Sequence, residues 1–200
     1  MAENSLGQRA RDIVVGISGA SGAIYGRRLL EALAEMEVTT HLVVTHPAAV
    51  TIRQELEVEP DAIRALATHA YDPANLAAPI ASGSFITSTA GMIVAPCSIK
   101  TLSAIAHSYT ANLLTRAADV TLKEGRPLIL VVRETPLHLG HLRLMAQAAE
   151  NGAVIFPPVP AFYHRPATIE AMVDHTVGRI LARMGVSNRL YRPWQGGDVA

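Results

Sequence analysis

The stretch Ile13–Gly22, IVVGISGASG, decides the fold class of this chain. Its first five residues are continuously apolar, which is typical of a strand buried on both faces of a sheet. A turn of small residues, 18–22, follows, and then Leu29, Leu30 and Leu33 recur at helical spacing. A buried strand, a glycine-rich turn and a helix in succession predict the first half of a βαβ unit.

Outward from this stretch, the chain repeats the same alternation. Apolar, β-branched runs at 39–45, 92–95, 128–132 and 153–155 predict further strands, and Pro96 is expected to end the third strand of the chain. Helical patterns separate them, at about 98–107, 111–124, 138–150 and 168–184, with a further helix beginning near Pro47. The sequence therefore predicts an α/β domain with one doubly wound, mainly parallel sheet.

Composition narrows the class of protein further. Of 200 residues, half are hydrophobic and only 17% are charged, below the usual ~25%, which excludes a disordered chain. Seventeen basic and seventeen acidic residues give no net charge to attract nucleic acid or an anionic membrane. The single cysteine, Cys97, excludes an internal disulfide and fits a reducing compartment.

These features predict one domain over residues 1–200, with a core at about 12–185 and polar tails. Residues 1–11 are polar and lack the apolar centre of a signal peptide, and no apolar run reaches the ~18 residues of a membrane span. We expect a cytoplasmic protein. Because apolar surface exceeds the charge available to cover it, we also expect an oligomer.

Ligands of doubly wound sheets bind beyond the carboxyl ends of the strands, so the loops that follow the strands are candidate sites. The first loop has the spacing Gly16-x-x-Gly19-x-x-Gly22 rather than Gly-x-Gly-x-x-Gly. The second strand ends at Thr45, where a dinucleotide site would have an acidic residue. The loop thus favours a mononucleotide over a dinucleotide, with a turn required only for packing as the alternative.

Two more loops carry groups that suit an anion. Ser98 is a good helix N-cap, and Lys100 in the same turn is unfavourable there unless an anion is present. Cys97 beside them is expected to be a small buried residue rather than a nucleophile. Arg133 and Glu134 directly follow the most strand-like run and are expected at a site, with an ion pair at the sheet edge as the alternative.

Other polar residues are less informative by themselves. Arg116, Asp119 and Lys123 share a helical face, and their spacing alone favours a solvated salt-bridge ladder. His138 and His141 lack the neighbouring carboxylate or thiolates of a zinc site, so we expect no metal.

Taken together, these segments resemble the flavin prenyltransferase family of the UbiX/Pad type. The resemblance covers roughly residues 12–195. The matching stretches are VGISGASGA (15–23), ASGS (81–84), PCSIKTL (96–102), RAADV (116–120), LKE (122–124), RETPL (133–137) and PAFYHRP (160–166). So many ordered matches are far more specific than any single loop.

The resemblance implies a flavodoxin-like, three-layer α/β/α domain that binds FMN and assembles as a dodecamer. It implies the transfer of a dimethylallyl group from dimethylallyl monophosphate to N5 and C6 of reduced FMN, without a metal ion. The prenylated FMN would serve UbiD-type decarboxylases, including one in ubiquinone synthesis.

The resemblance also assigns residues. It implies FMN contacts at Gly19, Ala20, Ser21, Thr45, Ser98, Ile99, Lys100, Thr101 and Arg133. It places Arg116, Lys123, Tyr163 and Arg179 at the prenyl phosphate, some of them from neighbouring subunits, which reverses the salt-bridge interpretation of Arg116 and Lys123. Ser21, Glu55 and Glu134 match positions linked to proton handling and flavin positioning.

The chain departs from the family at a few positions. Leu76 stands where several members have a tryptophan, and His46-Pro47 stands where relatives commonly have Lys-Ala. Two other functions remain open: a carrier that binds FMN without chemistry, and a flavin-dependent cysteine decarboxylase of the same broad fold. The first would not need Glu134, Lys123, Tyr163 and Arg179 together.

Overall fold

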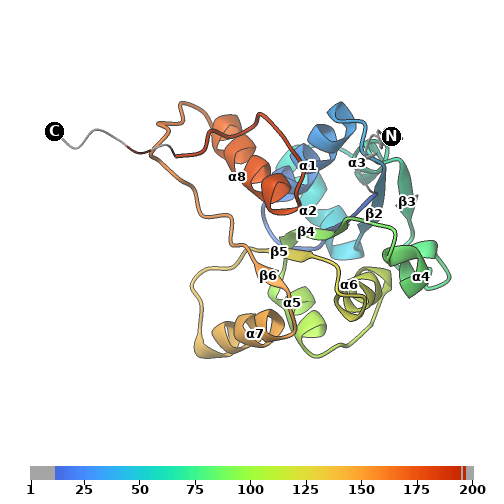
Figure 1. Ribbon diagram of the computed structural model, residues 1–200. Helices are drawn as coiled ribbons and strands as arrows, with labels where there is room; N and C mark the ends of the chain where they lie inside the picture. Colours follow the sequence, from blue (N-terminus) through green and yellow to red (C-terminus); the bar gives the residue numbers. More distant parts are fainter. Residues whose placement is uncertain (1–11, 195, 197–200) are drawn as a thin grey trace, which may run out of the picture.

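The computed structural model describes residues 12–194 and 196, which form a parallel sheet between two layers of helices (Figure 1). The polar N-terminal tail expected at 1–11 lies outside the described residues. The strands are β1 (Ile13–Ile17), β2 (Thr40–Val44), β3 (His69–Tyr71), β4 (Gly91–Cys97), β5 (Leu128–Val132) and β6 (Val154–Ile155). Each strand pairs in parallel with its neighbours, which confirms the doubly wound sheet.

The strand order is β3-β2-β1-β4-β5-β6. Without the three-residue edge strand β3, the other five strands have the 2-1-3-4-5 order of flavodoxin-like sheets. The order reverses between β1 and β4, and in sheets of this kind the loops that follow these two strands border a crevice. Ligands of open α/β sheets bind at this switch point.

Helices cover both faces of the sheet. One face carries α1 (Ala23–Glu35), α2 (His46–Leu56), α3 (Pro60–Arg64) and α8 (Ile169–Arg183). The other carries α5 (Ile99–Ala106), α6 (Leu113–Lys123) and α7 (Leu139–Glu150), with the short η1 (Pro79–Ala81) and α4 (Gly83–Ile86) against α6. None of the helices in the described part of the chain has the length and apolar character needed to span a bilayer.

Two hydrophobic cores follow from the alternation of side chains along the strands. Val15 and Ile93 point to the α1/α8 face, whereas Val14 and Met92 point to the α5/α6 face. All four side chains are fully buried. Continuous apolar strands are therefore required here, as the sequence of residues 13–17 and 128–132 predicts.

The structure corrects the prediction that Pro96 ends a strand. β4 continues through Pro96 to Cys97, and its register against β5 shifts between Val94 and Cys97. An irregularity of this kind accommodates a residue that has no N–H to donate. β3 was not predicted at all, because His69-Ala70-Tyr71 is a short, partly exposed edge strand without an apolar pattern.

Candidate functional site

Ser18 joins the two loops that border the crevice between β1 and β4. Its buried hydroxyl donates to the Pro96 carbonyl oxygen at 2.9 Å and accepts from the Ser98 N–H at 2.8 Å. The Ser18 N–H also donates to the same carbonyl at 3.2 Å. The glycine-rich turn and the β4–α5 loop are thus held together as one unit.

The glycine-rich turn also packs against the loop that follows β2. A Cβ atom on Gly19 would collide with the ring of Pro47, so this close approach requires glycine. Gly22 lies at φ 102°, a conformation that side chains disfavour, and it begins α1. The three loops at 18–22, 45–47 and 96–101 therefore meet at the carboxyl edge, as predicted.

Glu55 occupies the N-terminus of α1. This end of the helix has no capping side chain of its own, and Glu55 Oε2 accepts from the N–H groups of Gly22 and Ala23 at 2.8 Å each. A carboxylate is favourable at a helix N-terminus. The turn was predicted to favour an anion. At the amides of Gly22 and Ala23 that anion is the carboxylate of Glu55, a residue of α2.

The hydroxyl groups of the other two loops are helix caps. Thr45 accepts from the Ala48 N–H at 3.3 Å and begins α2. Ser98 accepts from the Thr101 N–H at 3.3 Å and donates to the Thr101 hydroxyl at 3.1 Å. Lys100, in the same turn, is exposed and forms no ion pair with any residue that the structure describes. Its charge is available to an anion, as the sequence predicts.

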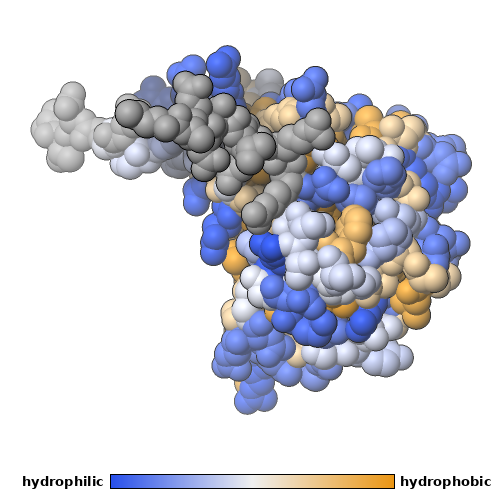
Figure 2. Space-filling model, turned by 45° about the vertical axis from the view of Figure 1, so that its right-hand side comes forward, coloured by the Kyte–Doolittle hydropathy of each residue, from blue (hydrophilic) through white to orange (hydrophobic). Residues whose placement is uncertain are grey.

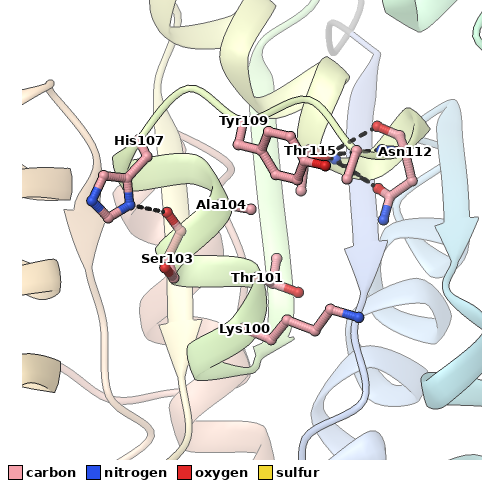
Figure 3. Close-up of a pocket in the computed structure, with 9 residues that line it drawn as sticks. Lys100, Thr101, Ser103, Ala104, His107, Tyr109, Asn112 and Thr115 are labelled. Atoms are coloured by element: carbon pink, nitrogen blue, oxygen red, sulfur yellow. Dashed lines mark hydrogen bonds between the residues drawn. The ribbon is translucent and has the colours of Figure 1, made fainter.

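A cavity of about 590 Å³ opens beside Lys100 and Thr101, between α5 and the start of α6 (Figure 3). Tyr109, Asn112 and Thr115 line it as well, and the sequence did not single them out. Asn112 and Thr115 form a reciprocal capping box, a pattern that a search for helix starts could have found. Tyr109 is 68% exposed over this opening. Its one sequence signal is that it is a lone aromatic residue in a polar loop.

Cys97 is fully buried and its pKa is raised, because burial disfavours the thiolate. The predicted role as a small buried residue is confirmed.

Arg133 and Glu134 extend the same edge of the sheet. The Arg133 N–H donates to the Cys97 carbonyl at 3.1 Å, which fixes this loop beside the β4–α5 loop. Both side chains are exposed, and among the residues that the structure describes Glu134 accepts only from the neighbouring Thr135 N–H, at 3.0 Å. Neither takes part in an ion pair within residues 12–194, so the alternative of a paired sheet edge is wrong.

Arg116 and Lys123 lie on α6, beside the stretch 81–84. Arg116 donates to the Ala81 carbonyl at 3.2 Å and pairs with Asp119 at 3.4 Å. Lys123 pairs with Glu124 at 2.5 Å instead of with Asp119. The predicted salt-bridge ladder is therefore only half formed.

Tyr163 and Arg179 lie elsewhere, in the loop after β6 and on α8. The Tyr163 hydroxyl lies 2.8 Å from Nε2 of His175, a residue that the sequence did not single out. Arg179 is exposed. α8 and α6 cover opposite faces of the sheet (Figure 1), so a single chain does not bring Tyr163 and Arg179 beside Arg116 and Lys123.

Comparison with known proteins gives concordant results. The sequence model of the Flavoprotein family matches residues 1–181. The chain is 56% identical over 187 residues to flavin prenyltransferase UbiX of Escherichia coli strain K12, covering 92% of this chain and 98% of the relative.

Two solved structures share the fold at high identity. One is AnUbiX (PadA1) in complex with FMN and dimethylallyl pyrophosphate, with a TM-score of 0.91, 46% identity, and coverage of 95% of this chain and 100% of that one. The other is a dodecameric FMN-dependent UbiX-like decarboxylase from Escherichia coli O157:H7, with a TM-score of 0.89, 47% identity, and coverage of 92% and 100%.

Proposed function

Because this chain belongs to the flavin prenyltransferase (UbiX) family, we propose that it transfers a dimethylallyl group from dimethylallyl monophosphate to N5 and C6 of reduced FMN. The observation that carries the proposal is the close identity to UbiX over nearly the whole chain. The ligand of AnUbiX is dimethylallyl pyrophosphate. The use of the monophosphate by this chain is therefore part of the proposal.

The crevice between β1 and β4 suits FMN. Gly19 and Ser21 are exposed on the glycine-rich turn, so part of its backbone is accessible to a ligand. Ser98, Lys100 and Thr101 at the first turn of α5 combine hydroxyl groups, a cation and a helix N-terminus, which together suit a phosphate or a flavin carbonyl. We assign FMN contacts to Gly19, Ala20, Ser21, Thr45, Ser98, Ile99, Lys100, Thr101 and Arg133.

When bound, reduced FMN supplies the nucleophilic atoms that accept the prenyl group. The residues of the chain then have to stabilise the phosphate that leaves. Arg116, Lys123 and Arg179 offer cationic donors and Tyr163 a hydroxyl donor, and such donors stabilise charge that develops in the transition state. Glu134 is exposed at the end of β5, and we assign to it the proton given to the leaving phosphate or taken from the acceptor.

We assign Ser21 and Glu55 to positioning and proton handling around the flavin. Glu55 holds the start of α1 through two hydrogen bonds, while Ser21 is exposed on the turn.

We propose that the phosphate site takes residues from more than one copy of the chain. Tyr163 and Arg179 lie on the opposite face of the sheet from Arg116 and Lys123, so a neighbouring subunit can complete the set. Exposed apolar side chains such as Leu76, Phe162 and Trp194 offer surface for assembly, and Figure 2 shows separate apolar patches on one side of the molecule. We propose a dodecamer, as described for the Escherichia coli O157:H7 protein.

The product would be consumed by a UbiD-type decarboxylase, in ubiquinone synthesis or a related pathway, and we place the protein in the cytoplasm. The single buried thiol fits a reducing compartment.

The test is anaerobic turnover. The protein is mixed with FMN, dithionite and either dimethylallyl monophosphate or the diphosphate, with a chelator of divalent metals, and the flavin mass is followed after quenching. We expect a gain of one prenyl unit with the monophosphate. A gain only with the diphosphate would correct the donor.

Bound FMN of unchanged mass, with the Escherichia coli K12 enzyme active in parallel, would support the carrier function instead. Loss of carbon dioxide from an aromatic acid by the protein alone would favour a decarboxylase, the activity by which the O157:H7 protein is described.

A further inference from the structure

His175 is the internal partner of the Tyr163 hydroxyl. It lies on α8, is only 5% exposed, and its Nε2 atom is 2.8 Å from the Tyr163 oxygen. The two rings meet edge to face, with centroids 5.5 Å apart at 78°. The Tyr163 side chain is 43% exposed, so the buried imidazole holds the polar end of a side chain that otherwise faces solvent.

The surroundings of His175 keep its imidazole neutral. Burial, the stacked His164 ring at 4.2 Å and the Arg179 charge one turn further along α8 together lower the pKa of His175. Tyr191 closes another side, edge-on at 6.0 Å. A neutral imidazole carries one N–H, and the hydrogen bonds of its neighbours decide which nitrogen bears it.

The Tyr163 hydroxyl has a second partner besides His175. Its hydroxyl donates to the Arg192 carbonyl oxygen at 3.4 Å, a long and therefore weak bond. A hydroxyl has one proton, so when Tyr163 donates to Arg192 it accepts from His175, and Nε2 of that imidazole bears the hydrogen. In this tautomer the Tyr163 proton points away from His175, toward an acceptor that a ligand oxygen can readily replace.

We propose that His175 is a positioning residue for the prenyl donor: its Nε2–H fixes the Tyr163 oxygen so that the Tyr163 O–H points at an oxygen of the donor phosphate. The proposal rests on the proposed function, which places Tyr163 at that phosphate. It adds a residue that makes no contact with the donor itself. Held in this way, Tyr163 loses less rotational freedom on binding, which strengthens the interaction.

Two variants separate this role from simple packing. His175→Gln retains an N–H donor within reach of the Tyr163 oxygen but loses the ring. His175→Phe retains the ring but has no donor. A packing role predicts that Phe is the better replacement, whereas a positioning role predicts that Gln is better.

The experiment uses the FMN-loaded protein and dimethylallyl monophosphate. Calorimetry with oxidised FMN gives the dissociation constant of the donor without turnover, and steady-state assays with reduced FMN give KM and kcat. We expect His175→Phe to weaken donor binding about tenfold, as Tyr163→Phe does, with His175→Gln within about threefold of the parent. FMN affinity should be unchanged in all three variants.

A cycle with Tyr163→Phe completes the test. In that background His175→Phe should cost nothing further, because the group it orients is gone. Equal donor affinity in His175→Phe and the parent protein, or a loss that persists in the Tyr163→Phe background, would overturn the proposal. If His175→Phe does not fold, His175→Leu replaces it. A parent protein that fails to bind or use the donor would instead remove the proposed function.

Discussion

Two regions of the molecule differ in how their polar groups are satisfied. The loop crevice, residues 18–22, 45–47 and 96–101, bonds its polar groups to one another: Ser18 joins two loops, and Glu55 holds the start of α1. The charged rim, formed by Arg116, Lys123, Glu134 and Arg179, is spread over three parts of the chain and is largely solvent exposed. The polar groups of the crevice are bonded within one chain, whereas the rim residues of α6 and α8 lie on opposite faces of the sheet and, in the proposed function, come together only between subunits.

Because of this difference, we expect changes in the two regions to affect different quantities, FMN affinity in one and kcat in the other. A fixed crevice holds a ligand without ordering cost, so changes there should weaken FMN binding. Exposed charges that meet the phosphate as it leaves should contribute mainly to the transition state, so changes there should lower kcat with FMN still bound.

The largest effect is expected at the rim. Glu134→Gln removes the acid–base group, and general acid–base catalysis contributes about 10²–10⁴-fold. We therefore expect kcat to fall by roughly 10²-fold or more, with the FMN dissociation constant unchanged. The rate is measured under steady-state conditions from the prenylated flavin formed over time, quantified by mass. Glu150→Gln, an exposed carboxylate at the end of α7, is the matched control. Normal turnover in Glu134→Gln would remove this residue from the mechanism.

Changes in the crevice should instead lower FMN affinity more than turnover. Gly19→Val places branched carbon atoms against the Pro47 ring, and overpacking of this kind costs about 1–3 kcal/mol. FMN affinity should fall by up to about 100-fold, measured by fluorescence titration, and turnover should recover in part at saturating FMN. Gly125→Asn is the control, because Gly125 at φ 63° has open space around it and asparagine tolerates that conformation. Unchanged FMN affinity in Gly19→Val would contradict the site.

Ser18→Ala tests whether the two crevice loops act together. It removes the hydroxyl that donates to the Pro96 carbonyl and accepts from the Ser98 N–H, and the loss of a buried hydrogen-bond partner costs about 1–3 kcal/mol. We expect a lower Tm and FMN binding weaker by about tenfold. Ser88→Ala, on an exposed turn, should change neither. A lower Tm with unaltered FMN binding would show that Ser18 serves stability alone.

The crevice was largely predictable from sequence because its determinants are local. Apolar residues 13–17 must form a buried strand, Gly19 and Gly22 must form the turn, and Ser98 must begin a helix, each for a reason contained in a few neighbouring residues. Parallel strands then bring the loops to one edge.

The long-range bonds could not be predicted in this way. Glu55 reaches a turn 32 residues earlier, and His175 meets Tyr163 across 12 residues of loop and helix. Neither partner has a sequence pattern, because each is selected by where α2 and α8 pack. The function of Arg116 and Lys123 required the family resemblance, since their spacing alone equally fits a salt-bridged helix face.

The smallest effect is expected at the amino ends of the strands, far from both regions. His41, the second residue of β2, is 4% exposed and lies 3.1 Å from Asp12 and 2.9 Å from the Tyr71 hydroxyl, with His69 stacked on it. Burial, opposed in part by Asp12, lowers its pKa below the usual 6.5. The unfolded chain therefore binds a proton below about pH 6.5 that the folded chain resists, and the free energy of unfolding should fall as the pH drops from about 6.5 through the folded pKa.

In His41→Gln this part of the pH dependence should disappear, so the loss of Tm between pH 7.5 and 5.5 should be smaller than in the parent. It should not vanish, because the lowered pKa of His175 acts in the same direction. His107→Gln, on an exposed helix end, is the matched control for replacing a histidine by glutamine. FMN affinity and kcat at pH 7.5 should be the same in all three proteins, since His41 belongs to neither the crevice nor the rim. A change in FMN affinity in His41→Gln would mean that the two ends of the sheet are coupled. FMN binding would then depend on the strands as well as on the crevice loops.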